Sequence, residues 1–232
     1  MIVKEMRFLE TLIELEHVGK SFIDNKQTIQ VLRDVNLEIK EGEFISLMGE
    51  SGSGKSTLLY IIAGFEFATS GEVKLLGKLY TSLDENSRAK LQRNNIGFVF
   101  QFYNLIQNLN VEDNILLPIS VLGKKRAKKQ ALEEILEYVG LEDKRKKKVA
   151  ELSGGEQQRV AVARAILMDM KILLADEPTG NLDHKNSVKI MELFQKVNQE
   201  KNMTILQVTH SKAMAEYGSK IYRLQEGILY AW

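Results

Sequence analysis

The sequence predicts an α/β protein in which a mostly parallel sheet is covered by helices. From Phe44 to the end of the chain, short apolar runs typical of strands alternate with segments of helical periodicity. A glycine-rich loop joins the first of these strands to the first helix. Between residues 111 and 139 two helical segments follow each other without a strand, which indicates a helical lobe inserted between strands of the main sheet.

The elements before the helical lobe are predicted in order. Two strands lie in the first forty residues, one at Leu12–Leu15 and one in which apolar and polar residues alternate around Leu37. A turn at Glu41-Gly42 separates them from the glycine-rich loop and its neighbours. The elements after that turn are a strand Phe44–Met48, a helix Ser56–Phe65, and strands Glu72–Leu76 and Ile96–Phe100.

The lobe and the C-terminal elements complete the prediction. Its first helix, Val111–Leu122, is expected to be interrupted by Pro118, and its second is Lys124–Val139. The later elements are strands Lys171–Ala175 and Thr204–Val208, helices His184–Glu200 and Ser211–Gly218, and strands Lys220–Leu224 and Gly227–Tyr230. There is no internal repeat and no linker rich in Pro, Gly or Ser, so we expect one domain with two lobes.

Composition excludes several classes of function. The 232 residues correspond to one large domain, or to one domain with an appended lobe. The 32 Lys and Arg nearly balance 31 Asp and Glu, and the net charge of +1 argues against a nucleic-acid-binding protein. The absence of Cys excludes disulfides and thiolate metal sites. No run of about 18 apolar residues is present, and charged residues interrupt the first nine positions, so we expect neither a membrane span nor a signal peptide.

A phosphate-binding loop is the first motif with clear chemistry. Its residues are Gly49, Glu50, Ser51, Gly52, Ser53, Gly54, Lys55, Ser56 and Thr57, which fit G-x-x-x-x-G-K-[ST] between a predicted strand and helix. The glycines let backbone N–H groups wrap a phosphate chain, and the helix adds its positive N-terminal end. Lys55 supplies charge for the β- and γ-phosphates, and Ser56 a hydroxyl for Mg²⁺. The alternative is an ordinary turn before a helix; both flanks favour a nucleoside triphosphate site.

Two carboxylates end a later apolar strand. Asp176 and Glu177 follow Ile172–Ala175, and a buried strand would bring Asp176 beside the phosphate loop, where it can hold Mg²⁺ directly or through water. Glu177 can then face the γ-phosphate and polarise an attacking water. The alternative is a solvated acidic turn. A GTPase is disfavoured because the guanine-reading Asn-Lys-x-Asp is absent.

A second glycine turn, Leu152–Glu156, opens another helix. Ser153 and the following glycines can bind an anion at the helix N-terminus, and Ser153 with Glu156 also fits a capping box. Anion binding and helix capping by Ser153 are compatible with each other.

Taken together, these motifs resemble the nucleotide-binding subunit of an ATP-binding cassette (ABC) transporter, from about Leu12 to Tyr230. The matching motifs are Gly49–Thr57 (Walker A), Gln101 (Q-loop), Leu152–Glu156 (signature), Ile172–Glu177 (Walker B), Gly180–Asp183 (D-loop) and His210 (switch histidine). The resemblance implies a P-loop NTPase of the ABC ATPase fold, with a mixed sheet core, an N-terminal antiparallel β subdomain and an inserted α-helical subdomain. Residues 1–232 would form one domain, with a core of about 12–100 and 165–232 and a helical subdomain of about 101–164.

The resemblance also implies roles for single residues, with ATP and Mg²⁺ as cofactors. The catalytic residues would be Lys55, Gln101, Glu177 and His210, and those at the metal Ser56, Gln101 and Asp176. Two copies would pair head to tail, so that ATP on the Walker A of one is closed by the signature of the other. The signature residues are Ser153, Gly154, Gly155 and Glu156, and Asp183 would communicate between the two sites.

One position departs from the family. Where a tyrosine usually stacks on adenine, this chain has Phe22. Stacking needs only a π-face, so Phe22 can serve; the alternative is a core or exposed aromatic without a role in binding.

Within the family, Gly97–Leu105 and Ala175–Asp183 resemble the macrolide-export and lipoprotein-release group. The chain would then power a separate membrane permease that exports a lipoprotein, macrolide or antimicrobial peptide. The same sequence segments also resemble the cell-division ATPase that regulates peptidoglycan hydrolysis without transport, and this alternative stays open. DNA-repair ATPases would need a long coiled-coil insertion, for which the fifty or so residues between Gln101 and Leu152 leave no room.

We expect the permease to hold the chain at the cytoplasmic face of the membrane, and the isolated chain to be soluble. Its docking helix is expected near Gln101–Asn110, with Phe102, Tyr103, Leu105 and Ile106 as apolar anchors. The basic residues at 124–129 and 144–148 are interpreted as a solvated face, with contact to anionic lipid as the alternative.

Overall fold

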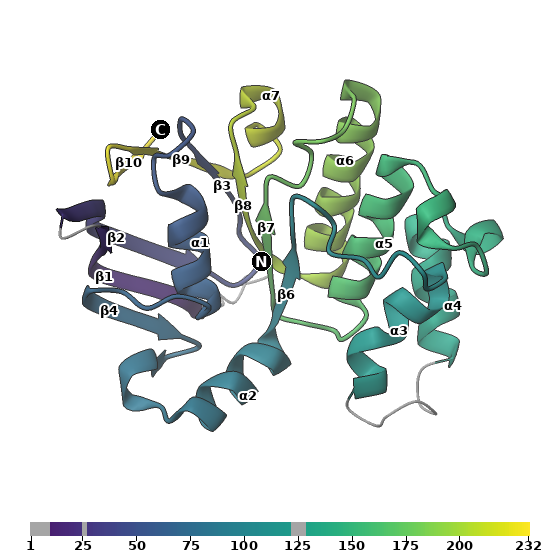
Figure 1. Ribbon diagram of the computed structural model, residues 1–232, viewed down its shortest axis with the longest axis horizontal. Coiled ribbons are helices and arrows are strands. Elements are labelled where there is room, and N and C mark those ends of the chain that lie inside the picture. The colour runs from purple at the N-terminus through teal and green to yellow at the C-terminus, as the bar shows by residue number, and fades with distance from the viewer. Residues whose placement is uncertain (1–9, 25–26, 122–128) are drawn as a thin grey trace, which may run out of the picture.

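The computed structural model describes residues 10–24, 27–121 and 129–232, which fold into two sheets flanked by helices (Figure 1). A four-stranded antiparallel sheet has the order β2-β1-β4-β5, and a six-stranded sheet has the order β10-β9-β3-β8-β7-β6. Helix α1 lies between the antiparallel sheet and the centre of the molecule, and α3, α4 and α5 lie at the opposite end. This is the mixed α/β architecture that the sequence predicts.

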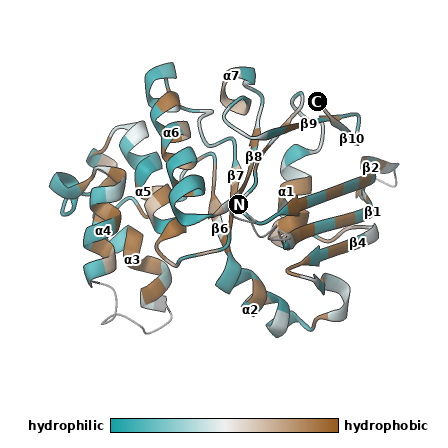
Figure 2. Ribbon diagram, turned by 180° about the vertical axis from the view of Figure 1, so that it is seen from behind, coloured by the Kyte–Doolittle hydropathy of each residue, from teal (hydrophilic) through white to brown (hydrophobic). Residues whose placement is uncertain are grey.

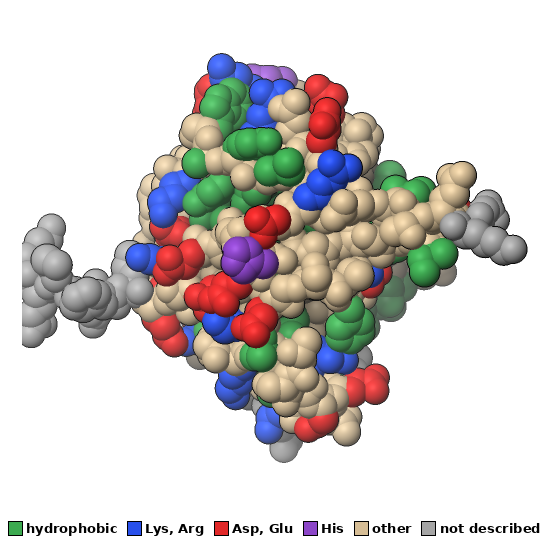
Figure 3. Space-filling model, turned by 90° about the vertical axis from the view of Figure 1, so that its left-hand side faces the viewer, with side chains coloured by type: hydrophobic (Ala, Val, Ile, Leu, Met, Phe, Trp, Pro, Cys, Tyr) green, Lys and Arg blue, Asp and Glu red, His purple; other side chains and the backbone are tan. Residues whose placement is uncertain are grey.

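The antiparallel sheet is built on two long strands. β1 (Thr11–Asp24) and β2 (Gln27–Lys40) pair along most of their length, and β4 (Ser70–Leu75) and the short β5 (Lys78–Leu79) continue the sheet. Both predicted strands are confirmed, but they are far longer than their apolar runs. The face of the molecule on this side mixes acidic, basic and hydrophobic side chains (Figure 3), in keeping with a net charge near zero.

The six-stranded sheet is parallel except for its last strand. Its members are β3 (Phe44–Met48), β6 (Ile96–Val99), β7 (Ile172–Asp176), β8 (Thr204–Thr209), β9 (Lys220–Gln225) and β10 (Ile228–Ala231). Strands β7 and β8 are buried throughout, as expected for a parallel sheet covered on both faces. The carboxyl ends of the parallel strands meet at one edge, so the residues that follow β3, β6, β7 and β8 are brought together there.

The helices match the predictions with two exceptions. They are α1 (Lys55–Ala63), α2 (Glu85–Asn95), α3 (Val111–Val121), α4 (Lys129–Val139), α5 (Gly154–Ile166), α6 (His184–Lys201) and α7 (Lys212–Ala215). The expected interruption at Pro118 is wrong: α3 has the proline inside it, since a helix can continue past a proline by giving up one backbone hydrogen bond and bending. Helix α2 was not predicted, since Leu91 is its one buried side chain and it is largely hydrophilic (Figure 2).

Part of one prediction falls outside the described residues. The start of the expected helix Lys124–Val139, with the basic residues at 124–126 and 128, belongs to the segment 122–128. In the second basic run, Arg145 and Lys146 both pair with Glu112 at the start of α3, and Lys144 pairs with Asp143.

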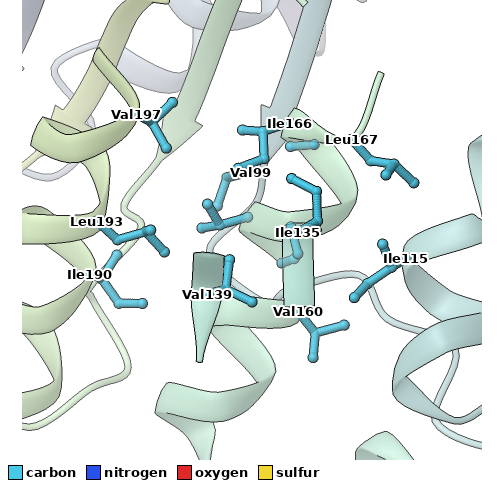
Figure 4. Close-up of a cluster of buried hydrophobic side chains, with 14 of the residues drawn as sticks. Val99, Ile115, Ile135, Val139, Val160, Ile166, Leu167, Ile190, Leu193 and Val197 are labelled. Atoms are coloured by element: carbon cyan, nitrogen blue, oxygen red, sulfur yellow. The ribbon is translucent and has the colours of Figure 1, made fainter. Parts of the chain in front are cut away.

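The central sheet separates two hydrophobic cores. Alternate residues of β7 point to opposite faces: Leu173 and Ala175 join the core of α3 to α6 (Figure 4), whereas Ile172 and Leu174 join the core around α1 and the antiparallel sheet. Helix α5 packs on α3, α4, α6 and β6, which binds the helical end of the molecule to the sheet. The subdomain boundaries near residues 101 and 164 stay a prediction.

Among the residues that the structure describes, no helix has the length and apolar character needed to cross a membrane.

Candidate nucleotide-binding site

The phosphate loop joins β3 to α1 in the conformation that its glycines allow. Gly52 and Gly54 have φ values of 79° and 99°, a region that L side chains rarely adopt. A Cβ on Gly49 would lie 2.4 Å from the Leu224 carbonyl oxygen, so this position has no room for a side chain. Gly54 forms the N-cap of α1 without a side-chain hydrogen bond, and no acidic residue lies in the first turn. The first N–H groups of α1 are therefore available to an anion.

Lys55 and Ser53 supply two further groups that fit a phosphate chain. The Lys55 ammonium is buried and donates to the carbonyl oxygens of Gly49 at 2.9 Å and Glu50 at 2.7 Å. Within the described part of the chain no carboxylate pairs with it. The Ser53 hydroxyl is buried without a hydrogen-bond partner. An uncompensated buried cation and an unpaired hydroxyl are both satisfied by phosphate oxygens.

Ser56 and Asp176 meet beside the loop. The Ser56 hydroxyl donates to Asp176 Oδ1 at 2.9 Å, and Asp176, the last residue of β7, is only 6% exposed. Burial, and secondarily the negative charge of Asp176, raise the pKa of the Tyr60 hydroxyl. No cluster of three or more His, Asp or Glu side chains that could hold a metal occurs in the described ranges. One hydroxyl and one carboxylate suit Mg²⁺, which takes its other ligands from phosphates and water.

Glu177, His210 and Gln101 complete the wall of one cavity. This cavity, of about 260 Å³, is lined by Ser51, Gly52, Lys55, Ser56, Gln101, Glu177 and His210. His210 Nδ1 lies 2.9 Å from Glu177 Oε2; the His210 side chain is 66% exposed and that of Glu177 13%. Glu177 has φ 46°, a costly conformation for a residue other than glycine, and such strain concentrates at functional sites. The structure thus brings all four predicted catalytic residues together around one space.

The Gln101 backbone is held from the segment after β7. Asn181 Nδ2 donates to the Gln101 carbonyl oxygen at 2.9 Å, while the Gln101 side chain lines the cavity. Asp183, in contrast, is the N-cap of α6 and accepts hydrogen bonds from the backbone and side-chain nitrogens of Asn186 at 2.9 and 2.5 Å. Both hydrogen bonds lower the pKa of the Asp183 carboxyl, and the one from the Asn186 backbone N–H has the larger effect. Asp183 does not line the cavity, and its role between two sites stays a prediction.

The residues Ser153, Gly154, Gly155 and Glu156 do not line the cavity. Ser153 caps α5: Glu156 Oε2 accepts from the Ser153 backbone N–H and hydroxyl, each at 2.8 Å, and the Glu156 N–H donates to the Ser153 hydroxyl at 3.4 Å. A Cβ on Gly155 would lie 2.8 Å from Asn186 Oδ1, so this glycine lets α5 approach α6. Nucleotide contact by these four residues is still a prediction.

Phe22 lies near the end of β1 and is 39% exposed. Lys20 Nζ lies 4.6 Å from the centre of its ring and is itself fixed by Glu66 Oε1 and the Phe67 carbonyl oxygen, each at 2.8 Å. The ring is thus supported and partly open, as adenine stacking requires. Its role stays a prediction.

Sequence reasoning missed several residues near the site. The phosphate loop is flanked by a second cavity of about 250 Å³, to which Arg223–Glu226 at the end of β9 contribute. Arg164 of α5 holds the chain just after Gln101, and no pattern marked it. Of the expected apolar anchors, Phe102 is 73% exposed and Ile106 is exposed, but Leu105 is buried in the core and unavailable to a partner.

Comparison with known proteins gives consistent matches. A family model described as ABC transporter matches residues 32–180. The lipoprotein-releasing system ATP-binding protein LolD of Francisella tularensis subsp. holarctica is 40% identical, over 95% of this chain and 96% of that protein. The uncharacterized ABC transporter ATP-binding protein YbbA of Escherichia coli is 43% identical, over 95% and 97%.

Solved structures agree in fold. The dimeric post-hydrolysis state of the ATP-binding cassette MJ0796, bound to ADP and Pi, has a TM-score of 0.84 and 41% identity, covering 94% of this chain and 96% of that one. CbiO1 of Clostridium perfringens, part of the ABC transporter complex CbiONQ, has a TM-score of 0.85 and 26% identity, covering 95% and 87%.

Proposed function

Because the chain belongs to the ABC transporter family as an ATP-binding subunit, we propose that it powers a separate membrane permease that releases or exports lipoproteins. The predicted ABC ATPase fold is confirmed, and so are the cofactors ATP and Mg²⁺ and the ATPase activity that define this family. The lipoprotein substrate is supported by relatives such as LolD of Francisella tularensis and of Saccharophagus degradans.

The observation that carries this proposal is the convergence of Lys55, Ser56, Gln101, Glu177 and His210 on one cavity. Lys55 and the N–H groups of α1 would hold the phosphates, and Ser56 and Asp176 would hold the cation. Bound Mg²⁺ would neutralise charge that develops between the phosphates.

Proton transfer and water positioning are assigned to the other residues that line the cavity, Glu177, His210 and Gln101. Glu177 accepts a proton from the attacking water, because its carboxylate is little exposed and faces the cavity. His210, whose Nδ1 lies 2.9 Å from Glu177 Oε2, would contact the γ-phosphate, and the Gln101 amide would orient the water.

A second copy of the chain is needed in this proposal. The cavity contains none of Ser153, Gly154, Gly155 or Glu156, so within one chain the signature turn does not contact the nucleotide. The similar cassette MJ0796 is dimeric, and a head-to-tail pair of this chain would place the exposed Ser153 against the nucleotide of its partner.

The permease would dock on the helical end of the molecule and thereby hold the chain at the cytoplasmic face of the membrane. A cavity of about 530 Å³ has walls from β6, α3 and α5. Its lining includes Phe98, Phe100, Leu117 and Pro118, and the exposed Phe102 and Ile106 follow the same strand. An apolar cavity of this kind suits an amphipathic helix of a partner.

Glu177→Gln tests the enzymatic core of the proposal. Without a base, hydrolysis of Mg-ATP is expected to fall at least about 100-fold, while ATP binding persists and a nucleotide-bound dimer accumulates. Release of phosphate, equilibrium ATP binding and size-exclusion chromatography measure the three effects. Glu192→Gln on the exposed side of α6 is the matched control. A Glu177→Gln protein that hydrolyses ATP normally rules out the base.

Capture of the membrane partner tests the second part of the proposal, namely that the chain powers a permease that releases lipoproteins. The chain purified from mild detergent is expected to carry an integral membrane protein, and vesicles containing both should release a bound lipoprotein only with hydrolysable ATP. If the captured protein instead activates a peptidoglycan hydrolase and releases no lipoprotein, the cell-division alternative replaces the transport function. The similarity to lipoprotein-releasing proteins favours the first result.

A further inference from the structure

The chain just after Gln101 adopts an unusual backbone conformation. Tyr103 and Asn104 are consecutive and have φ values of 60° and 48°, in the left-handed region that residues with a Cβ avoid. The turn is tight, since the Asn104 N–H donates to the Phe102 carbonyl oxygen at 2.6 Å. Such a conformation persists only where the surrounding structure holds it.

Arg164 on α5 is the side chain that holds it. Its Nη1 donates to the Asn104 carbonyl oxygen at 2.6 Å and its Nη2 to the Tyr103 carbonyl oxygen at 2.9 Å. The two nitrogens of one planar fork thus bind the carbonyls of the two left-handed residues. A second side chain, Asn181, donates to the Gln101 carbonyl oxygen. The Gln101 loop, residues 101–104, is therefore fixed through three carbonyl groups.

The surroundings of Arg164 disfavour the positive charge of its guanidinium group, so this residue is not explained by packing alone. Burial lowers the pKa of its guanidinium, and among the described residues no carboxylate lies within ion-pair distance of it. A largely buried cation with only neutral partners is unfavourable in itself. Arg164 and Asn104 also line the cavity of about 530 Å³. The same two hydrogen bonds thus connect the wall of that cavity to the loop that carries Gln101.

We propose that Arg164 is a positioning residue for ATP hydrolysis. By holding Tyr103 and Asn104 in the left-handed conformation, it sets the path of the loop and keeps the Gln101 side chain in the nucleotide cavity. This inference rests on the proposed function, because it takes Gln101 to act on the attacking water. Arg164 itself does not line the nucleotide cavity.

Arg164→Met is the first test, on the purified full-length chain with Mg-ATP. The methionine keeps much of the side-chain volume but removes both hydrogen bonds, so the Gln101 loop should relax. We expect kcat to fall about 10-fold to 100-fold, because a misplaced group near the reacting atoms usually has an effect of this size. Affinity for a fluorescent ATP analogue should stay within about twofold, because Lys55 and the phosphate loop do not contact Arg164. Arg88→Met, which removes a guanidinium from α2, is the matched control and should leave kcat unchanged.

Two further variants separate positioning from folding. Arg164→Lys keeps the charge but cannot bind two carbonyls as a fork, so kcat should lie between those of the wild type and Arg164→Met; it also serves if Arg164→Met does not fold. Asn104→Gly in the Arg164→Met background should recover part of kcat, because glycine adopts a φ of about +48° without strain and the loop keeps its path unaided.

The outcomes are distinct. A wild-type chain without Mg-dependent hydrolysis overturns the proposed function itself. If the wild type is active and Arg164→Met keeps kcat within about twofold, the inference is wrong. It is also wrong if kcat, nucleotide affinity and Tm all fall together and Asn104→Gly restores none of them, since Arg164 would then be purely structural. A fall in kcat alone, with partial recovery by Asn104→Gly, supports it.

Discussion

The two helices that begin at glycine turns, α1 and α5, start in opposite ways. At α1 the N-cap is Gly54, no side chain accepts from the first N–H groups, and the first turn holds no acid. At α5 the N-cap is Ser153, and Glu156 closes a reciprocal capping box with it. Both starts follow from short motifs rich in Gly and Ser, yet one leaves its donors open and the other satisfies them.

Because of this difference, the two turns differ in how many backbone N–H groups they can offer to an anion. An uncapped helix start offers N–H groups and a positive end to a phosphate within its own chain. A capped start has already used part of these donors, and the negative charge of Glu156 opposes an anion in the first turn. In the proposed function, the α5 turn would contact a nucleotide through its exposed groups, Ser153 above all, when a second chain brings one to it.

Lys55→Met should have the largest effect on the α1 side. It removes a buried cation beside the phosphate loop, together with its hydrogen bonds to the Gly49 and Glu50 carbonyl oxygens. We expect kcat/KM to fall at least about 1,000-fold, because charge that stabilises the transferred phosphoryl group is lost. Steady-state phosphate release measures it, with Lys185→Met on the exposed start of α6 as control. Retention of half the activity would mean that α1 does not hold the phosphates.

Ser153→Arg should reduce hydrolysis by a different route. The new side chain obstructs closure over the nucleotide of the partner, so activity should fall about 100-fold while the single chain binds ATP as before. Mixing Ser153→Arg and Lys55→Met chains provides the decisive measurement. A mixed head-to-tail dimer contains one site in which Lys55 and Ser153 are both intact, so the mixture should regain activity that neither variant has. Mixed dimers that form but stay inactive would contradict the head-to-tail arrangement.

The comparison also shows what a sequence can predict. The strand Phe44–Met48 has the predicted bounds, because a phosphate loop requires a strand before it and a helix after it. Helix α2 has no such constraint: its pattern is polar, and only Leu91 faces the core. Arg164 could not be found, since its partners are backbone carbonyls some sixty positions away, which any residue type provides. The burial of Leu105 likewise follows from packing against the inserted helices.

Phe22→Ala is expected to weaken ATP binding about tenfold, since base stacking on an aromatic ring contributes about 1–3 kcal/mol. The ring is exposed on one side and supported by Lys20 on another, so its loss should leave the sheet intact. Titration of a fluorescent nucleotide measures the change, and unaltered circular dichroism confirms folding. Ile23→Ala, at the more exposed neighbouring position, is the control. Equal affinity in the Phe22→Ala protein would remove this residue from the nucleotide site.

Glu156→Gln tests the capped start and should have the smallest effect, a loss of about 0.5–1 kcal/mol in the free energy of unfolding. Hydrogen bonds from the Ser153 backbone and hydroxyl lower the pKa of Glu156 in the folded chain. Its contribution is therefore complete above the pKa of the unfolded chain, about 4.3, and disappears as the pH falls through the lower folded value. Urea unfolding of both proteins at pH 7 and near pH 3 should show the difference shrinking with acid. Glu85→Gln is a suitable control, because it removes an acid from the first turn of α2, where Asp84 provides the cap. If Glu156→Gln costs no stability at pH 7, the start of α5 is not satisfied by its own residues, and the distinction from α1 would have to rest on Ser153 alone.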